Sequence, residues 1–102
     1  MGLDDDFLRE FALTFLSDVD SRLPLLEEQL KFFDGRKLRD TAHSFSGSST
    51  CIGAERLHEL TVELEQAALS GQLQASQDAF ENFHTELQRV CSFLREFLEQ
   101  SQ

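Results

Sequence analysis

The stretch RKLRDTAHSFSGSSTCI, residues 36–52, combines one apolar helical face with a histidine on the opposite face. The apolar face consists of residues at helical spacing: Leu38, Ala42, Phe45, Ser49 and Ile52. A rotation of about 100° per residue places His43 roughly 140° from the centre of that face. The stretch therefore predicts a helix over about residues 36–51, ending before a break at Gly53, with His43 exposed to solvent.

Small or polar residues surround His43 on this exposed face. They are Arg39, Asp40, Ser46, Gly47 and Thr50. Gly47 in a helix interior costs about 1 kcal/mol relative to Ala, and the neighbouring serines are indifferent helix formers. Residues that weaken a helix in this way are expected at functional sites. Here their small side chains leave room for another protein to reach the imidazole. A close helix–helix contact is the alternative, but it requires Gly47 on the buried face.

Residues 4–33 predict a first helical segment that opens with acidic residues, which suit a helix N-terminus. Its apolar stripe comprises Leu8, Phe11, Phe15, Val19, Leu23, Leu26, Leu30 and Phe33. Pro24 predicts a kink, or a split into two helices around residues 20–23. Asp34 and Gly35 are expected to close the segment, with Gly35 in the left-handed conformation that is common after helix ends.

Two more helices are expected, over about residues 54–69 and 73–99, with a turn at Ser70 and Gly71 between them. Short connections favour antiparallel neighbours. The expected fold is all-α: an antiparallel four-helix bundle with an N-terminal helical lid or a kinked first helix, forming a single domain over residues 1–102.

The composition restricts the classes of function. The chain has 102 residues and a formal net charge of −10, which argues against binding to nucleic acid or to anionic membranes. No apolar run approaches the roughly 20 residues of a membrane span, and residues 4–6 are acidic where a secretory signal is basic. We expect a cytoplasmic domain, free or part of a membrane-anchored protein, without membrane insertion of its own.

The run AHSFSGSS, residues 42–49, is followed by Ile52-Gly53-Ala54 and by Leu57, Leu60 and Leu64-Glu65. This series resembles the histidine-containing phosphotransfer (HPt) domains of two-component phosphorelays, whose usual pattern is A-H-x-L-K-G-S-S, then a Gly-Ala step and a Leu-rich helix ending in Glu. The similarity extends in length and helix order over nearly the whole chain. It implies a four-helix bundle whose histidine is phosphorylated by the aspartyl-phosphate of a receiver domain.

The resemblance implies a role for each matching residue. His43 is the phosphorylated residue, and Gly47 leaves clearance for the partner. Ser48 and Ser49 supply helix packing and polar support, and Glu65 is a neighbour of the histidine from the next helix.

Ser46 departs from the family pattern, which usually has a Lys there that holds the phosphoryl group by its charge. Arg39, one turn before His43, is a candidate for a substitute charge.

The serine at position 46 leaves open a second function, an HPt-like helical interaction module that is not phosphorylated. A third possibility is a metal- or cofactor-binding bundle enzyme, which needs inward-facing sets of Glu and Glu-x-x-His residues. Cys51 and Cys91 have no metal-ligand spacing, and we expect two buried thiols.

We expect Nε2 of His43 to attack the phosphorus of the aspartyl-phosphate in line, because a neutral imidazole is nucleophilic at its unprotonated nitrogen. The sequence contains no phosphate-binding Gly-rich loop. We therefore expect Mg²⁺ on the receiver domain, no cofactor bound by this chain and no autonomous kinase activity. The expected partners are a response-regulator receiver domain and a hybrid sensor histidine kinase.

The helix over 54–69 is expected to dock the partner. Its side beside the core line contains His58, Val62, Glu65 and Leu69, and the expected contact residues are Val62, Leu69 and Thr50. Alternatively, Val62 and Leu69 merely widen the core stripe.

Phe7, Leu13 and Leu25 of the first segment are candidates to extend the docking surface. His58 and His84 are otherwise expected to be ordinary surface or rim histidines.

Overall fold

The computed structural model describes the backbone of residues 5–51 and 54–100, and the side chains of residues 6–47 and 54–100. Within these ranges the chain forms four helices: α1 (Asp5–Lys31), α2 (Gly35–Cys51), α3 (Glu55–Ser70) and α4 (Leu73–Gln100). The last three agree with the predicted helices to within a residue at each end. Gly53, the expected break after α2, lies outside the described residues.

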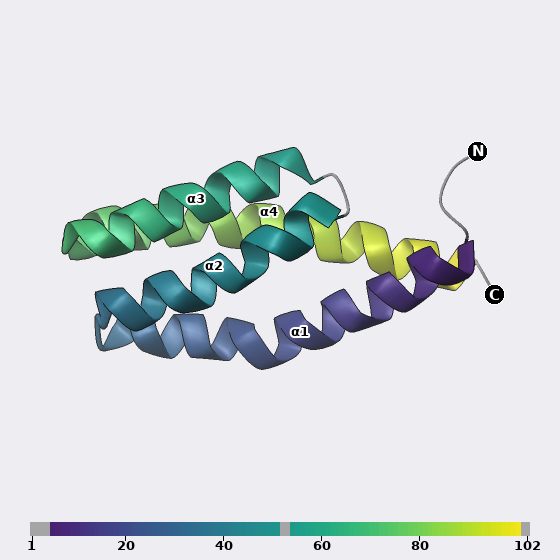
Figure 1. The fold of residues 1–102 in the computed structure, drawn as a ribbon, viewed down its shortest axis with the longest axis horizontal. Coiled ribbons are helices and arrows are strands. Elements are labelled where there is room, and N and C mark those ends of the chain that lie inside the picture. Colours follow the sequence, from purple (N-terminus) through teal and green to yellow (C-terminus); the bar gives the residue numbers. More distant parts are fainter. Residues whose placement is uncertain (1–4, 52–53, 101–102) are drawn as a thin grey trace.

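Consecutive helices run in opposite directions, and the longer α1 and α4 extend together beyond the C-terminal end of α2 and the N-terminal end of α3 (Figure 1). α2 packs against α1 and α3, and α4 packs against α3 and α1, so the four helices close into a bundle. The expected all-α antiparallel four-helix bundle is confirmed. None of the helices in the described part of the chain combines the length and apolarity needed to cross a membrane.

The core determines how α2 is rotated about its axis. Leu38, Ala42 and Phe45 are buried, and the Phe45 ring packs edge-to-face on Phe83 of α4 with 5.4 Å between ring centroids. Because these residues point into the bundle, the opposite face of α2 points to solvent.

Cys91 of α4 is a free, buried thiol, and burial raises its pKa.

α1 passes through Pro24 without interruption, so the predicted split into two helices is not found. Figure 1 shows α1 as one ribbon that bends along its length. Pro24 is exposed, and the carbonyl that loses its helical partner therefore lies where water can bind it. Val19 and Leu26, on either side of the proline, are both buried, so the core holds the two halves in one helical register.

The turn between α1 and α2 differs from the prediction at Gly35. The residue in the left-handed conformation is Phe33, with φ of 46°. The Asp34 amide donates to the Gln29 carbonyl (3.0 Å) and the Phe33 amide to the Leu30 carbonyl (3.2 Å), which is the Schellman pattern at a helix C-terminus. The prediction was wrong because it assigned the left-handed position to the nearest glycine.

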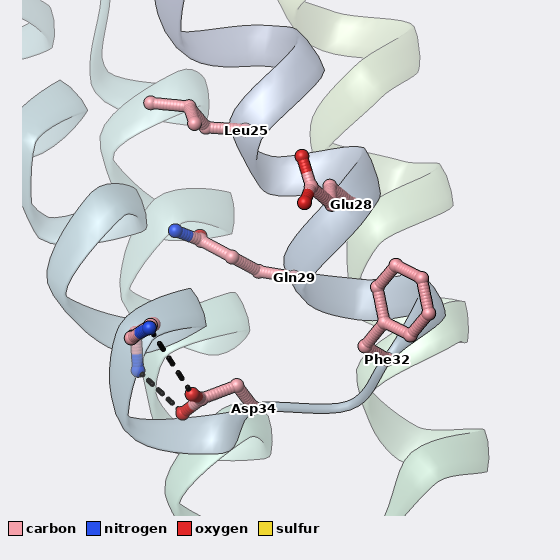
Figure 2. Close-up of a pocket in the computed structure, with 6 residues that line it drawn as sticks. Leu25, Glu28, Gln29, Phe32 and Asp34 are labelled. Atoms are coloured by element: carbon pink, nitrogen blue, oxygen red, sulfur yellow. Dashed lines mark hydrogen bonds and ion pairs between the residues drawn. The ribbon is translucent and has the colours of Figure 1, made fainter.

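Gly35 is instead the first residue of α2, and its lack of a side chain permits a close helix contact. A Cβ at Gly35 would lie 2.5 Å from the Ala68 carbonyl oxygen of α3. Asp34 caps α2 by accepting a hydrogen bond from the Lys37 amide (3.1 Å), and its carboxylate points into the first turn of the helix (Figure 2). Gly71, by contrast, has φ of 74° and ends α3, as the predicted turn requires.

Candidate functional site

His43 projects from the middle of α2 into solvent, with 68% of its side chain exposed. The neighbouring Ala42 is fully buried, so the packing that holds α2 in the bundle also directs His43 outward. The structure therefore confirms the predicted exposure of the imidazole.

Glu65 of α3 contacts the His43 ring from the adjacent helix. Its Oε1 lies 2.8 Å from Nδ1 of His43, and 15% of the Glu65 side chain is exposed. An ionised carboxylate only accepts hydrogen bonds, so Nδ1 of His43 is the donor. A neutral ring with its proton on Nδ1 has its lone pair on Nε2, the nitrogen farther from the backbone. The pair thus orients the ring and sets its tautomer.

Gly47, one turn after His43, has no packing role within the described part of the chain. A Cβ built on it meets nothing within 4 Å, whereas a Cβ on Gly35 of the same helix meets the backbone of α3. The alternative of a close helix–helix contact at Gly47 is therefore wrong. Because glycine has no side chain, nothing projects from α2 at this position beside His43.

Ser46 and His58 form a second polar contact between α2 and α3. The Ser46 Oγ lies 3.1 Å from Nδ1 of His58, and both side chains are half-buried. Sequence reasoning treated His58 as a surface or rim histidine and did not pair it with Ser46. One signal in the sequence indicated which side of α3 carries His58. It is seven residues, or two helical turns, from Glu65, so both residues lie on the same side of the helix.

Arg39, the candidate for a substitute charge, lies in an ion pair on its own helix. Its Nε is 3.1 Å from Oδ1 of Asp40. The guanidinium charge is thus partly offset by its neighbour, and the role predicted for Arg39 stays a prediction.

The residues expected to dock a partner differ in exposure. Leu69 is 62% exposed and lies one turn after Glu65, whereas Val62 is half-buried. Phe7, Leu13 and Leu25 of α1 are each about half exposed, at 53%, 52% and 47%. Leu69 is therefore an exposed apolar group on the helix that contacts His43.

Three predicted site residues cannot be placed by their side chains. Ser48, Ser49 and Thr50 belong to the last turns of α2, and their side chains lie outside the described residues.

His84, on α4, stacks on Phe80 with 5.7 Å between ring centroids, as suits a rim histidine.

A sequence model of the Hpt domain family matches residues 10–101 of the chain. The chain is an Hpt domain. No curated protein sequence and no solved structure gives a significant match. The family match covers α1 from residue 10 onward and the whole of α2, α3 and α4, and it includes both His43 and Glu65. Hpt domains act in phosphotransfer within two-component phosphorelays, where they interact with receiver domains, and this function applies to the present Hpt domain.

Proposed function

We propose that His43 is the phosphorylated residue of this Hpt domain and that it exchanges a phosphoryl group with an aspartate of a receiver domain. The observation that carries the proposal is the pairing of an exposed imidazole with a sheltered carboxylate at 2.8 Å. Glu65 accepts the Nδ1 proton and so leaves the Nε2 lone pair directed away from the helix.

In the transfer step the Nε2 lone pair forms an N–P bond while the P–O bond to the receiver's aspartate breaks. The bonding electrons leave with the aspartate as a carboxylate. The ring gains positive charge as the N–P bond forms, and the Glu65 carboxylate offsets that charge through the Nδ1–H hydrogen bond. The reverse step returns the phosphoryl group to an aspartate, so the domain is a phosphocarrier with no kinase activity of its own.

The receiver domain supplies the remaining chemistry under this proposal. Mg²⁺ and the acidic pocket that holds it belong to the receiver, and this chain binds no cofactor. Leu69 and Val62 contact the receiver beside His43. The absence of a side chain at Gly47 lets the backbone of the receiver approach the imidazole. A receiver or a hybrid sensor kinase as partner implies a cytoplasmic location for the domain.

The test is transfer of label from a phosphorylated receiver. The host's receiver domains are loaded with ³²P from acetyl phosphate and mixed with this protein, and the expected product is an acid-labile, alkali-stable label. His43→Gln should abolish the label, whereas the matched variant His84→Gln should keep it. Absence of label with every receiver would overturn the proposal and favour a non-phosphorylated interaction module.

A further inference from the structure

The contact between Ser46 and His58 has no place in the chemistry described so far, yet it lies next to His43. Ser46 is one turn after His43 on α2, and its Oγ is 3.1 Å from Nδ1 of His58 on α3. Both side chains are half-buried, so the contact is more sheltered than the exposed ring of His43.

Helix geometry directs Ser46 toward His43. Residues three apart on a helix have Cβ atoms about 5–6 Å apart. The Cα–Cβ bond also tilts toward the helix N-terminus, so the hydroxyl of Ser46 leans toward the turn that contains His43. Gly47, the next residue, has no side chain to separate Ser46 from a group bound to the histidine.

A phosphoryl group on His43 would enter a region rich in negative charge. The Glu65 carboxylate lies 2.8 Å from the ring, and the Arg39 guanidinium is paired with Asp40. The chain as a whole has a formal net charge of −10. Phosphoryl oxygens in such surroundings need hydrogen-bond donors, and a hydroxyl can supply one.

A serine hydroxyl has a single proton, and a ring N–H that donates to its oxygen leaves that proton for another acceptor. If Nδ1 of His58 were unprotonated, Ser46 would donate to it. If Nδ1 of His58 bears a proton, the ring donates to Oγ, and the hydroxyl proton can turn to a phosphoryl oxygen.

We propose that His58 is a positioning residue for phosphotransfer: its Nδ1–H donates to Ser46 Oγ and thereby turns the Ser46 hydroxyl toward the phosphoryl group on His43. The inference rests on the proposed role of His43. It assigns to a Ser–His pair across α2 and α3 the task of holding the phosphoryl group.

The test compares variants that keep or remove the donor at His58. His58→Phe removes it at similar size, whereas His58→Asn keeps an N–H near the position of Nδ1. The single-turnover transfer rate from a phosphorylated receiver and the half-life of phospho-His43 are measured for each. We expect His58→Phe to slow transfer roughly tenfold, because the Ser46 hydroxyl is then no longer directed to the charged phosphoryl group, and His58→Asn to restore most of the rate.

A double-mutant cycle with Ser46→Ala shows whether His58 acts through the serine. Ser46→Ala alone should slow transfer about as much as His58→Phe, and the double variant should be no slower than either single one. The ³¹P resonance of the phosphohistidine should shift in both single variants but not in the control His84→Phe. Thermal melting followed by circular dichroism establishes that the variants are folded.

The failures of the two proposals are distinguishable. If the unaltered protein takes no label on His43, the proposed function fails and this inference fails with it. If His43 is labelled normally but His58→Phe and His58→Asn transfer equally fast, the positioning role of His58 is overturned. Strictly additive effects of His58→Phe and Ser46→Ala would also overturn it.

Discussion

The carboxylate of Glu65 lies 2.8 Å from Nδ1 of His43, so a side chain of α3 holds a ring that α2 exposes. The two residues are 22 positions apart and meet because α2 and α3 pack side by side. The contact fixes the ring plane and the tautomer together, and it leaves Nε2 available to a partner.

The first prediction concerns this contact. Glu65→Ala should lower the rate of phosphotransfer roughly tenfold to a hundredfold, because a free ring spends little time in the reactive orientation. Glu65→Gln keeps an oxygen that accepts from Nδ1 but loses the negative charge, so its rate should lie between those of Glu65→Ala and the unaltered protein. Single-turnover transfer from a labelled receiver measures both. Equal rates for the alanine and glutamine variants would contradict the orienting role of Glu65.

The second prediction concerns Gly47, where stability and function should change in opposite directions. Gly47→Ala should raise the free energy of unfolding by up to about 1 kcal/mol, since alanine is the better helix former and its Cβ meets nothing within 4 Å. Gly47→Gln should slow transfer, because its longer side chain obstructs the partner beside His43. Urea unfolding and transfer rates are measured on the same preparations. Wild-type transfer by Gly47→Gln would show that clearance is not required.

The third prediction uses the same substitution elsewhere on α2. Gly35→Ala should lower the free energy of unfolding by roughly 1–3 kcal/mol, a cost typical of overpacking. The added Cβ would lie 2.5 Å from the backbone oxygen of Ala68, which cannot move aside as a flexible side chain can. Gly47→Ala is the matched control with the opposite sign. Unchanged or increased stability of Gly35→Ala would contradict the close contact between α2 and α3.

The fourth prediction concerns the docking surface. Leu69→Ala should weaken binding to the receiver about fivefold to tenfold, as truncation of an apolar anchor does, and should leave the melting temperature nearly unchanged because Leu69 is 62% exposed. Phe93→Ala on α4 is the control, since Phe93 is 65% exposed on another helix. Isothermal titration against the receiver that transfers label measures both affinities. An equal loss in the two variants would indicate that Leu69 has no special part in docking.

Much of this architecture could be predicted from periodicity alone. The apolar residues of α2 recur at helical spacing, and because a helix has one geometry, burial of Leu38 and Phe45 fixes the exposure of His43. The same reasoning identified Gly47 as an exposed glycine with no packing role. These features depend on a single helix, so its sequence is sufficient.

Features that depend on two elements could not be predicted in the same way. Gly35 was assigned a local role at a helix end, but its actual constraint is the backbone of α3 at Ala68, which becomes a neighbour only in the folded bundle. Pro24 was expected to kink or divide α1, and burial on both sides of it keeps one helix. The pairing of Ser46 with His58 depends on how far α2 is shifted along α3, and helical periodicity does not contain that offset.

The identity of the phosphorylated atom is best tested by NMR of the protein labelled with ¹⁵N in its histidine rings, before and after phosphorylation by a receiver. We predict that the unphosphorylated His43 ring has its proton on Nδ1, and that coupling to ³¹P then appears on Nε2 of His43 while His58 and His84 show no such coupling. Coupling to Nδ1 of His43, or to the ring of His58 or His84, would contradict the proposed role of the His43–Glu65 pair.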